Sequence, residues 1–209
     1  MGIYLNPGAA AFQIARNSQI YVDKSELIRK LNQVLNTEQR FVCISRPRRF
    51  GKSMAANMVC AYYDRTADKK VFDGLSLTLQ EGMIQQGKFN VLRINMQEFL
   101  SETKNIEELL SLLKESLLWE LLEEYPDFHY FKKDNLRFVM DTIAKKSGLD
   151  FVVVIDEWDC IFREYPHDGA AQKRYLDFLR DWLKDKTYIA LAYMTGILPV
   201  AYTSWLFRI

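Results

Sequence analysis

The sequence is short of the residues that build metal sites and disulfide frameworks. Among 209 residues it has only three cysteines, Cys43, Cys60 and Cys160, and two histidines. The cysteines are widely spaced, lack the paired spacing of a zinc site, and two of them lie in or beside apolar segments. We therefore expect reduced, buried thiols, a cytoplasmic location and no metal site made of cysteine and histidine.

An excess of one charge and long hydrophobic runs are also missing. The 28 Lys and Arg residues balance 27 Asp and Glu residues, so no overall basic field argues for nucleic acid. No uninterrupted apolar run approaches the length that spans a membrane, and the N-terminus has no basic segment followed by an apolar stretch. We expect no membrane association and no signal peptide.

Apolar residues make up 49% of the sequence, which is enough for a packed core. Apolar segments typical of strands at 40–44, 91–95, 151–155 and 188–194 alternate with segments typical of helices. This alternation predicts an α/β fold with a parallel sheet flanked by helices. Helices are expected over 9–16, from 23 or 25 to about 35, and over 51–65, 105–123, 135–146 and 172–185, with short elements near 71–72 and 75–79 and a brief extended piece at 20–22.

The most informative motif is Ser45-Arg46-Pro47-Arg48-Arg49-Phe50-Gly51-Lys52-Ser53, between an expected strand and an expected helix. Gly-Lys-Ser in this setting is how P-loop proteins hold nucleotide phosphates (the Walker A motif). Gly51 lets the backbone approach the phosphates, Lys52 would reach the outer ones, and the Ser53 hydroxyl would ligate Mg²⁺. The expected nucleotide-binding residues are Arg48, Arg49, Phe50, Gly51, Lys52, Ser53 and Met54.

Three arginines crowd this loop, and Arg46 stands where the motif usually has its first glycine. Guanidinium groups bind phosphate well, so one or more of Arg46, Arg48 and Arg49 could neutralise phosphate charge. The alternative is that they pair with acids such as Asp156, Glu157 or Asp159, and the sequence leaves this choice open.

Two carboxylates follow Phe151–Ile155, a run that is apolar at every position and therefore suits a central parallel strand. Ligands of open α/β sheets lie at the carboxyl ends of the strands. We assign Asp156 to Mg²⁺ and Glu157 to the base that polarises a water (the Walker B pair). The alternative is that both are surface acids capping the next helix. Thr195, at the end of the last strand, either senses the γ-phosphate or is an ordinary residue before a turn.

Together, the motifs at 21–24, 45–53, 155–159 and 195–199 resemble the AAA-ATPase-like proteins of bacteria, over nearly the whole chain from Tyr4 to Pro199. The resemblance implies ATP and Mg²⁺ as ligands and makes the arginine-rich loop a family feature. It matches Lys52 and Ser53 to the phosphate and Mg²⁺ contacts, Asp156 and Glu157 to the metal and hydrolytic carboxylates, and Thr195 to the sensor position. Segment 21–24 lies where related ATPases often contact the base.

The resemblance ends after Pro199. Family members continue with a longer ATPase region and a lid, and often with a nuclease-like domain of the PD-(D/E)XK type, and residues 200–209 do not look like that continuation. We therefore expect one domain over 1–209, with a helical N-terminal segment at 1–39, a nucleotide-binding core at 40–199 and an atypical tail at 200–209. We expect no lid and no nuclease activity.

The expected function is Mg²⁺-dependent ATP binding and hydrolysis of the β–γ bond by this truncated core. Three alternatives stay open. They are a nucleotide-binding interaction or regulatory module without turnover, a P-loop kinase of a small molecule, and a non-functional fragment of a longer ATPase–nuclease protein. A protein partner or a second copy of the chain is compatible with all of them, whereas nucleic acid as a partner rests only on analogy with the family.

Overall fold

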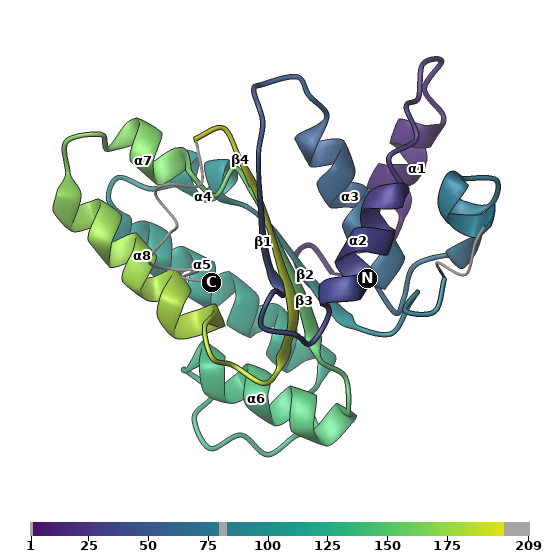
Figure 1. Cartoon of the computed structure of the whole chain (residues 1–209). Coiled ribbons are helices and arrows are strands. Elements are labelled where there is room, and N and C mark those ends of the chain that lie inside the picture. Colours follow the sequence, from purple (N-terminus) through teal and green to yellow (C-terminus); the bar gives the residue numbers. More distant parts are fainter. Residues whose placement is uncertain (1, 80–82, 199–209) are drawn as a thin grey trace.

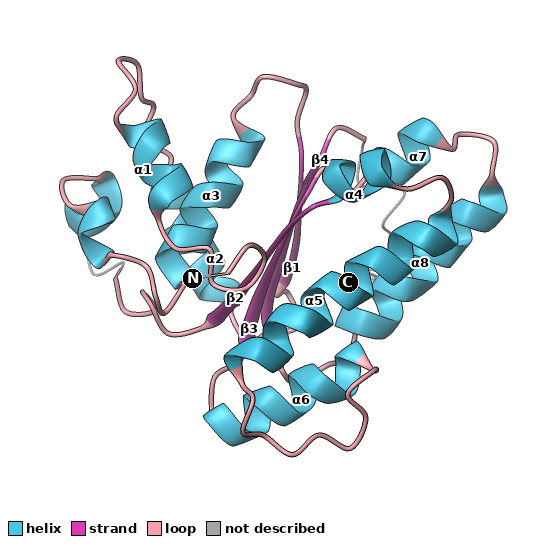
Figure 2. Cartoon of the chain, turned by 180° about the vertical axis from the view of Figure 1, so that it is seen from behind, coloured by secondary structure: helices cyan, strands magenta, loops and turns pink. Residues whose placement is uncertain are grey.

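Four parallel strands form one sheet with helices on both faces (Figures 1 and 2). The computed structural model describes residues 2–79 and 83–198. The strands are β1 (Phe41–Ser45), β2 (Asn90–Asn95), β3 (Phe151–Asp156) and β4 (Ile189–Gly196), in the spatial order β1-β4-β3-β2. The α/β fold with a parallel sheet that the sequence predicts is confirmed, and it is consistent with a P-loop NTPase-like core.

The carboxyl ends of all four strands meet at one edge of the sheet. Ser45 of β1 pairs with Gly196 of β4, and Asn95 of β2 pairs with Asp156 of β3. Every residue of β3 and β4 is buried, as expected of central strands that are covered on both faces. Because β4 lies between β1 and β3, the residues at its end stand between the loop after β1 and the acids after β3.

The helices divide into two layers. One face carries α1 (Ala10–Arg16), α2 (Glu26–Val34) and α3 (Lys52–Tyr63) with the short 3-10 helices η1 (Lys69–Phe72) and η2 (Ser76–Leu79). The other carries α4 (Met96–Glu102), α5 (Ile106–Glu124), α6 (Leu136–Ser147), α7 (Cys160–Glu164) and α8 (Gly169–Leu183). Alternate side chains of β3 enter the two cores, Val152 and Val154 with α1–α3, and Val153 and Ile155 with α4–α8.

The expected helices all form, and local capping explains two of their boundaries. Asn105 accepts a hydrogen bond from the Glu108 N–H at 3.0 Å and starts α5, and Gly148, with φ of 71°, ends α6. Two short helices were not expected, α4 directly after β2 and α7 after the acids of β3. The brief extended piece at 20–22 pairs with no strand of the described sheet, and Tyr21 packs its ring on Phe12 instead.

The first residues of the chain cover the outer edge of β2. The Arg93 N–H donates to the Tyr4 carbonyl at 2.8 Å, and the Asn6 N–H donates to the Val91 carbonyl at 2.7 Å. Glu120 of α5 accepts from the Tyr4 N–H at 2.8 Å and also from the N–H groups of Ile3 and Leu5. Backbone groups at this sheet edge are therefore paired within the chain.

Two expectations concern the limits of the described chain. Pro199 and the expected atypical tail at 200–209 lie outside the described residues. Over residues 2–79 and 83–198, none of the helices combines the length and the apolar character needed to cross a membrane.

Candidate functional site

The loop between β1 and α3 is a tight turn held to the end of β4. The Arg46 N–H donates to the Gly196 carbonyl at 3.1 Å. Arg49 and Gly51 both have left-handed backbone conformations, with φ of 69° and 73°. Gly51 precedes α3, and no side chain caps this helix. The turn therefore leaves the N–H groups at the start of α3 available to an anion.

Two lysine side chains from different parts of the chain contact this loop. Lys52 is only 7% exposed, and its Nζ donates to the Pro47 carbonyl at 3.2 Å. Lys24 donates from Nζ to the Phe50 carbonyl at 2.8 Å, and a Cβ at Gly51 would stand 2.7 Å from that nitrogen. No acid forms an ion pair with Lys52 in the described part of the chain. A buried ammonium group with only a carbonyl partner suits a site that receives an anion.

Asp156 is positioned by β4. It lies at the end of β3, is 2% exposed, and its Oδ1 accepts from the Thr195 hydroxyl and from the Glu157 N–H, the latter at 3.1 Å. Within residues 2–79 and 83–198, no protein donor reaches its Oδ2. One carboxylate oxygen is therefore held in place, and the other is left for a ligand.

Glu157, the next residue, has a strained backbone conformation and a charged partner. Its φ is 52°, in the left-handed region, and its Oε2 accepts from Arg163 Nη2 at 2.6 Å. The same guanidinium lies 3.6 Å from Asp159, measured from Nε to Oδ1. Among the described residues it is therefore Arg163 of α7, rather than Arg46, Arg48 or Arg49, that forms ion pairs with Glu157 and Asp159.

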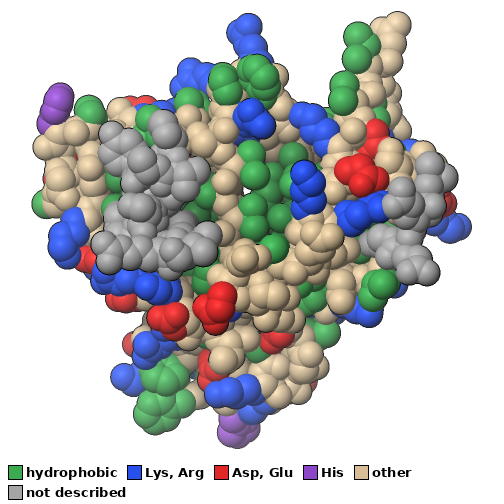
Figure 3. All heavy atoms as spheres, viewed as in Figure 1, with side chains coloured by type: hydrophobic (Ala, Val, Ile, Leu, Met, Phe, Trp, Pro, Cys, Tyr) green, Lys and Arg blue, Asp and Glu red, His purple; other side chains and the backbone are tan. Residues whose placement is uncertain are grey.

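A cavity of about 610 Å³ brings the loop and the strand ends together. Lys and Arg side chains gather over the loop between β1 and α3, at the top of the molecule in Figure 3. The cavity is lined by Arg48, Arg49, Gly51, Lys52, Ser53, Met54, Asn95, Gln97, Asp156, Glu157, Arg163 and Glu164. Of the loop arginines, therefore, Arg48 and Arg49 reach the cavity.

Two of the predicted site residues do not line this cavity. The Phe50 side chain is 60% exposed, and its backbone carbonyl is bound by Lys24. Thr195 is completely buried, and its hydroxyl donates to Asp156, which lines the cavity. We place both at the border of the site.

Four lining residues were missed by sequence reasoning. Asn95 and Gln97 follow β2, and polar residues at the end of a parallel strand are a signal that could have found them. Arg163 and Glu164 lie on a helix of five residues, which is too short to give a periodic pattern.

The donors at the cavity fit Mg²⁺ rather than a fully protein-bound metal. No group of three or more His, Cys, Asp or Glu side chains that could hold a metal ion occurs among the described residues. Mg²⁺ is usually held by one or two protein oxygens together with water and phosphate oxygens. Ser53 and Asp156, which line the same cavity, provide two such oxygens.

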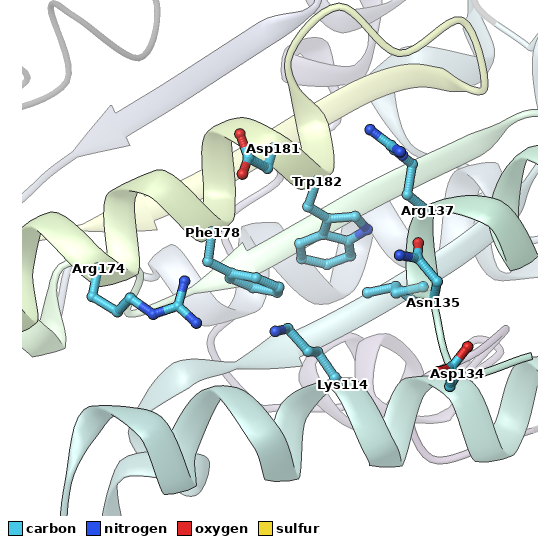
Figure 4. Close-up of a pocket in the computed structure, with 9 residues that line it drawn as sticks. Lys114, Asp134, Asn135, Arg137, Arg174, Phe178, Asp181 and Trp182 are labelled. Carbon is cyan, nitrogen blue, oxygen red and sulfur yellow. The ribbon is translucent and has the colours of Figure 1, made fainter. Parts of the chain in front are cut away.

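A second cavity of about 300 Å³ lies between α5, α6 and α8 (Figure 4). Phe178 and Trp182 form its apolar side with stacked rings 5.6 Å apart, and Lys114 Nζ lies 5.3 Å above the Phe178 ring. Its rim mixes cations with Asp134 and Asp181, and no strand end contributes to it. Unlike the first cavity, it is therefore lined neither by the Gly-Lys-Ser loop nor by the acids at the end of β3.

Thiol and imidazole chemistry find no support in the described residues. Burial raises the pKa of Cys43 to about 11 and the pKa of Cys60 and Cys160 to about 12, so these thiols stay protonated near neutral pH. His129 and His167 are exposed and line neither cavity. The chemistry of the site therefore rests on lysine, arginine, hydroxyl and carboxylate groups.

Comparison with known proteins agrees with this geometry. A family model described as predicted AAA-ATPase matches residues 8–206. No curated protein matches the sequence significantly. Because the matched region covers most of the chain and contains both the arginine-rich loop and the acids at the end of β3, the chain belongs to the AAA-ATPase-like family.

Proposed function

We propose that this protein binds ATP with Mg²⁺ in the cavity between the β1–α3 loop and the end of β3, and hydrolyses the β–γ bond. One observation carries the proposal: the buried Lys52, without an acidic partner in the described residues, lines the same cavity as Asp156 and Glu157. A buried ammonium group without an acidic partner in the described residues, beside two carboxylates, is complementary to a metal–triphosphate. Membership of an AAA-ATPase-like family supports this assignment.

In this proposal the loop binds the phosphates. The N–H groups at the start of α3 and the Lys52 ammonium offset their negative charge. Arg48 and Arg49 add two guanidinium groups at the same cavity, and such groups bind phosphate oxygens in pairs of hydrogen bonds. Gly51 keeps the turn without a side chain at the point of closest approach.

The acids act on the metal and on water. Ser53 and Asp156 would hold Mg²⁺, which when bound would offset charge on the phosphate oxygens. Glu157 accepts a proton from a water whose oxygen attacks the γ-phosphorus, and the bond from that phosphorus to the β–γ bridging oxygen breaks. Thr195 fixes the orientation of Asp156 by its hydrogen bond to Oδ1.

The first test is the affinity for MgATP of a Lys52→Met variant. We expect its Kd to rise at least about tenfold, which is about 1.4 kcal/mol of binding free energy. Lys133→Met removes an exposed lysine far along the chain and serves as the matched control, with an unchanged Kd. The same Kd for Lys52→Met and the wild-type protein would contradict the proposed phosphate site.

The second test is phosphate release, which separates hydrolysis from binding. We expect steady release by the wild-type protein and a loss of about a hundredfold or more in Glu157→Gln, because a general base contributes roughly 10² to 10⁴ in rate. Glu123→Gln, an exposed position on α5, is the control. Equal release by Glu157→Gln and the wild-type protein would remove Glu157 from the role of base.

A second candidate is a nucleotide-binding module without turnover. It would follow if the Arg163 guanidinium, which pairs with one oxygen of Glu157, kept this carboxylate from accepting a proton. For such a module MgATP would raise the melting temperature of the protein while no phosphate is released.

A further inference from the structure

We propose that Arg163 is a positioning residue for hydrolysis, which holds one oxygen of Glu157 so that the other stays available to water. The inference rests on the proposed function, because it gives Arg163 its role through the assigned base. It adds a residue outside the phosphate loop and outside the acids that follow β3, and it assigns a purpose to the short helix α7.

The first support is the rigid placement of α7. Trp158, two residues before this helix, is completely buried; its backbone N–H donates to the Thr195 carbonyl at 3.1 Å, and its carbonyl accepts from the Tyr175 hydroxyl at 2.9 Å. Cys160 and Ile161 of α7 are completely buried as well. A helix anchored in this way presents Arg163 to the cavity from a fixed backbone.

The second support is the geometry of the ion pair. Arg163 Nη2 lies 2.6 Å from Glu157 Oε2, and only 17% and 23% of the two side chains are exposed. Charged hydrogen bonds of this length that are partly shielded from water are among the stronger ones in proteins. The contact is therefore able to select one orientation of the Glu157 carboxylate.

The third support is the backbone of Glu157. A residue with a side chain rarely adopts its left-handed φ of 52°, and such conformations persist when the surroundings hold them. The Glu157 N–H is held by Asp156 Oδ1 and its carboxylate by Arg163. Among the described residues no donor reaches Oε1, so this oxygen is left for water. A base oriented by a third group is the arrangement of many activated sites.

A further contact ties Arg163 to the end of β4. Its Nε lies 3.6 Å from Oδ1 of the completely buried Asp159. Oδ2 of Asp159 accepts from the N–H groups of Ile197 and Leu198, both at 2.7 Å. The Ser45 hydroxyl, at the start of the arginine-rich loop, donates to the Ile197 carbonyl at 2.9 Å. Arg163 therefore joins the assigned base to the segment that borders the phosphate loop.

The test combines kinetics with unfolding. In Arg163→Met we expect kcat for ATP hydrolysis to fall about tenfold to a hundredfold, the scale seen when a group that orients an active-site residue is lost. KM should stay within about threefold, because the lost contact does not touch substrate. Arg163→Lys should recover part of kcat. Arg174→Met, which removes a surface ion pair between Arg174 on α8 and Glu107 on α5, is the matched control and should behave as wild type.

A double variant distinguishes positioning from an independent effect. If Arg163 acts through Glu157, the Glu157→Gln, Arg163→Met protein should be no slower than Glu157→Gln alone. The urea midpoint of unfolding is measured without nucleotide for both single variants and the double variant. The shifts of this midpoint from the wild-type value should be non-additive, because the two side chains are in contact.

Each contrary result has a definite meaning. A higher kcat in Arg163→Met would make Arg163 a restraint, and a raised KM with unchanged kcat would make it a phosphate contact; both overturn the inference. Additive shifts of the urea midpoint would show that the ion pair is absent in solution. They would overturn the inference without any measurement of turnover. No phosphate release by the wild-type protein would overturn the proposed hydrolysis and this inference together, whereas normal release with an unaffected Arg163→Met would overturn the inference alone.

Discussion

Thr195 and Asp156 form the contact that joins the ends of β4 and β3 at the cavity. Both are almost fully removed from solvent, and the hydroxyl donates to a charged acceptor. A buried carboxylate that loses one of its donors keeps the cost of desolvation without the compensating bond. The contact therefore serves the stability of the sheet edge as well as the orientation of a metal ligand.

We expect Thr195→Val to lower the free energy of unfolding by about 1–3 kcal/mol, because the Asp156 Oδ1 loses a hydrogen-bond donor while the shape of the side chain is kept. Urea unfolding measures this change. Thr142→Val is the control, since its hydroxyl donates only to the Phe138 carbonyl one turn earlier in α6. A smaller loss in Thr195→Val than in Thr142→Val would contradict the role given to the buried pair.

At the scale of elements, Glu120 shows how one side chain holds a segment. It lies on α5, is 5% exposed, and accepts hydrogen bonds from three successive backbone N–H groups at residues 3–5. These residues run antiparallel to β2 through the bridge between Leu5 and Leu92. The covering of the sheet edge therefore depends on a carboxylate more than a hundred positions away in the chain.

We predict that Glu120→Ala loses about 3 kcal/mol of stability, since three N–H groups, that of Leu5 buried and those of Ile3 and Tyr4 partly buried, lose a charged acceptor. Hydrogen exchange should also become faster at the amides of residues 3–5. Glu123→Ala, on the same helix but exposed, should change neither quantity measurably. Unchanged exchange at residues 3–5 in Glu120→Ala would show that Glu120 does not anchor this segment.

Elements with strong local signals were predictable, and short ones were not. The apolar run of β3 and the capping residue Asn105 of α5 carry their structure in the local sequence. Helix α7 has five residues and forms because Trp158 and its neighbours are buried against α8 and β4, which no local pattern reveals. Ser25 occupies the N-cap position of α2, yet its hydroxyl accepts from the Leu77 N–H instead, a tertiary contact that overrides local capping.

At the scale of the whole molecule, burial decides how stability depends on pH. Burial raises the pKa of Cys60 and Cys160 to about 12 and that of Cys43 to about 11, against about 8.5 in an unfolded chain. Between about pH 8.5 and these values the unfolded chain releases thiol protons that the folded protein retains. The folded state then binds more protons, so its stability falls as the pH rises through this window and is unaffected by the thiols below it.

We expect the free energy of unfolding to fall between pH 8 and pH 10, as measured by urea unfolding at each pH. In Cys60→Ala the fall should be shallower, by up to about 1.4 kcal/mol per pH unit above pH 8.5, because one titrating thiol is gone. The comparison of slopes is independent of any constant loss of stability in the variant. Identical slopes would show that the Cys60 thiol titrates equally in both states.

The sequence alone determined the class of the fold, because periodicity and the all-apolar run of β3 are local properties that burial imposes on each element. It also located the loop at 46–51 and the acids at 156 and 157 by their positions after strands. Only the tertiary structure decided which charges meet. Arg163 lies six residues after Glu157, and the loop arginines lie more than a hundred residues before it. The fold of α7 pairs Arg163 with Glu157, whereas Arg48 and Arg49 line the cavity without forming an ion pair in the described residues. The choice among charged partners depends on distances in space, which local sequence patterns do not contain.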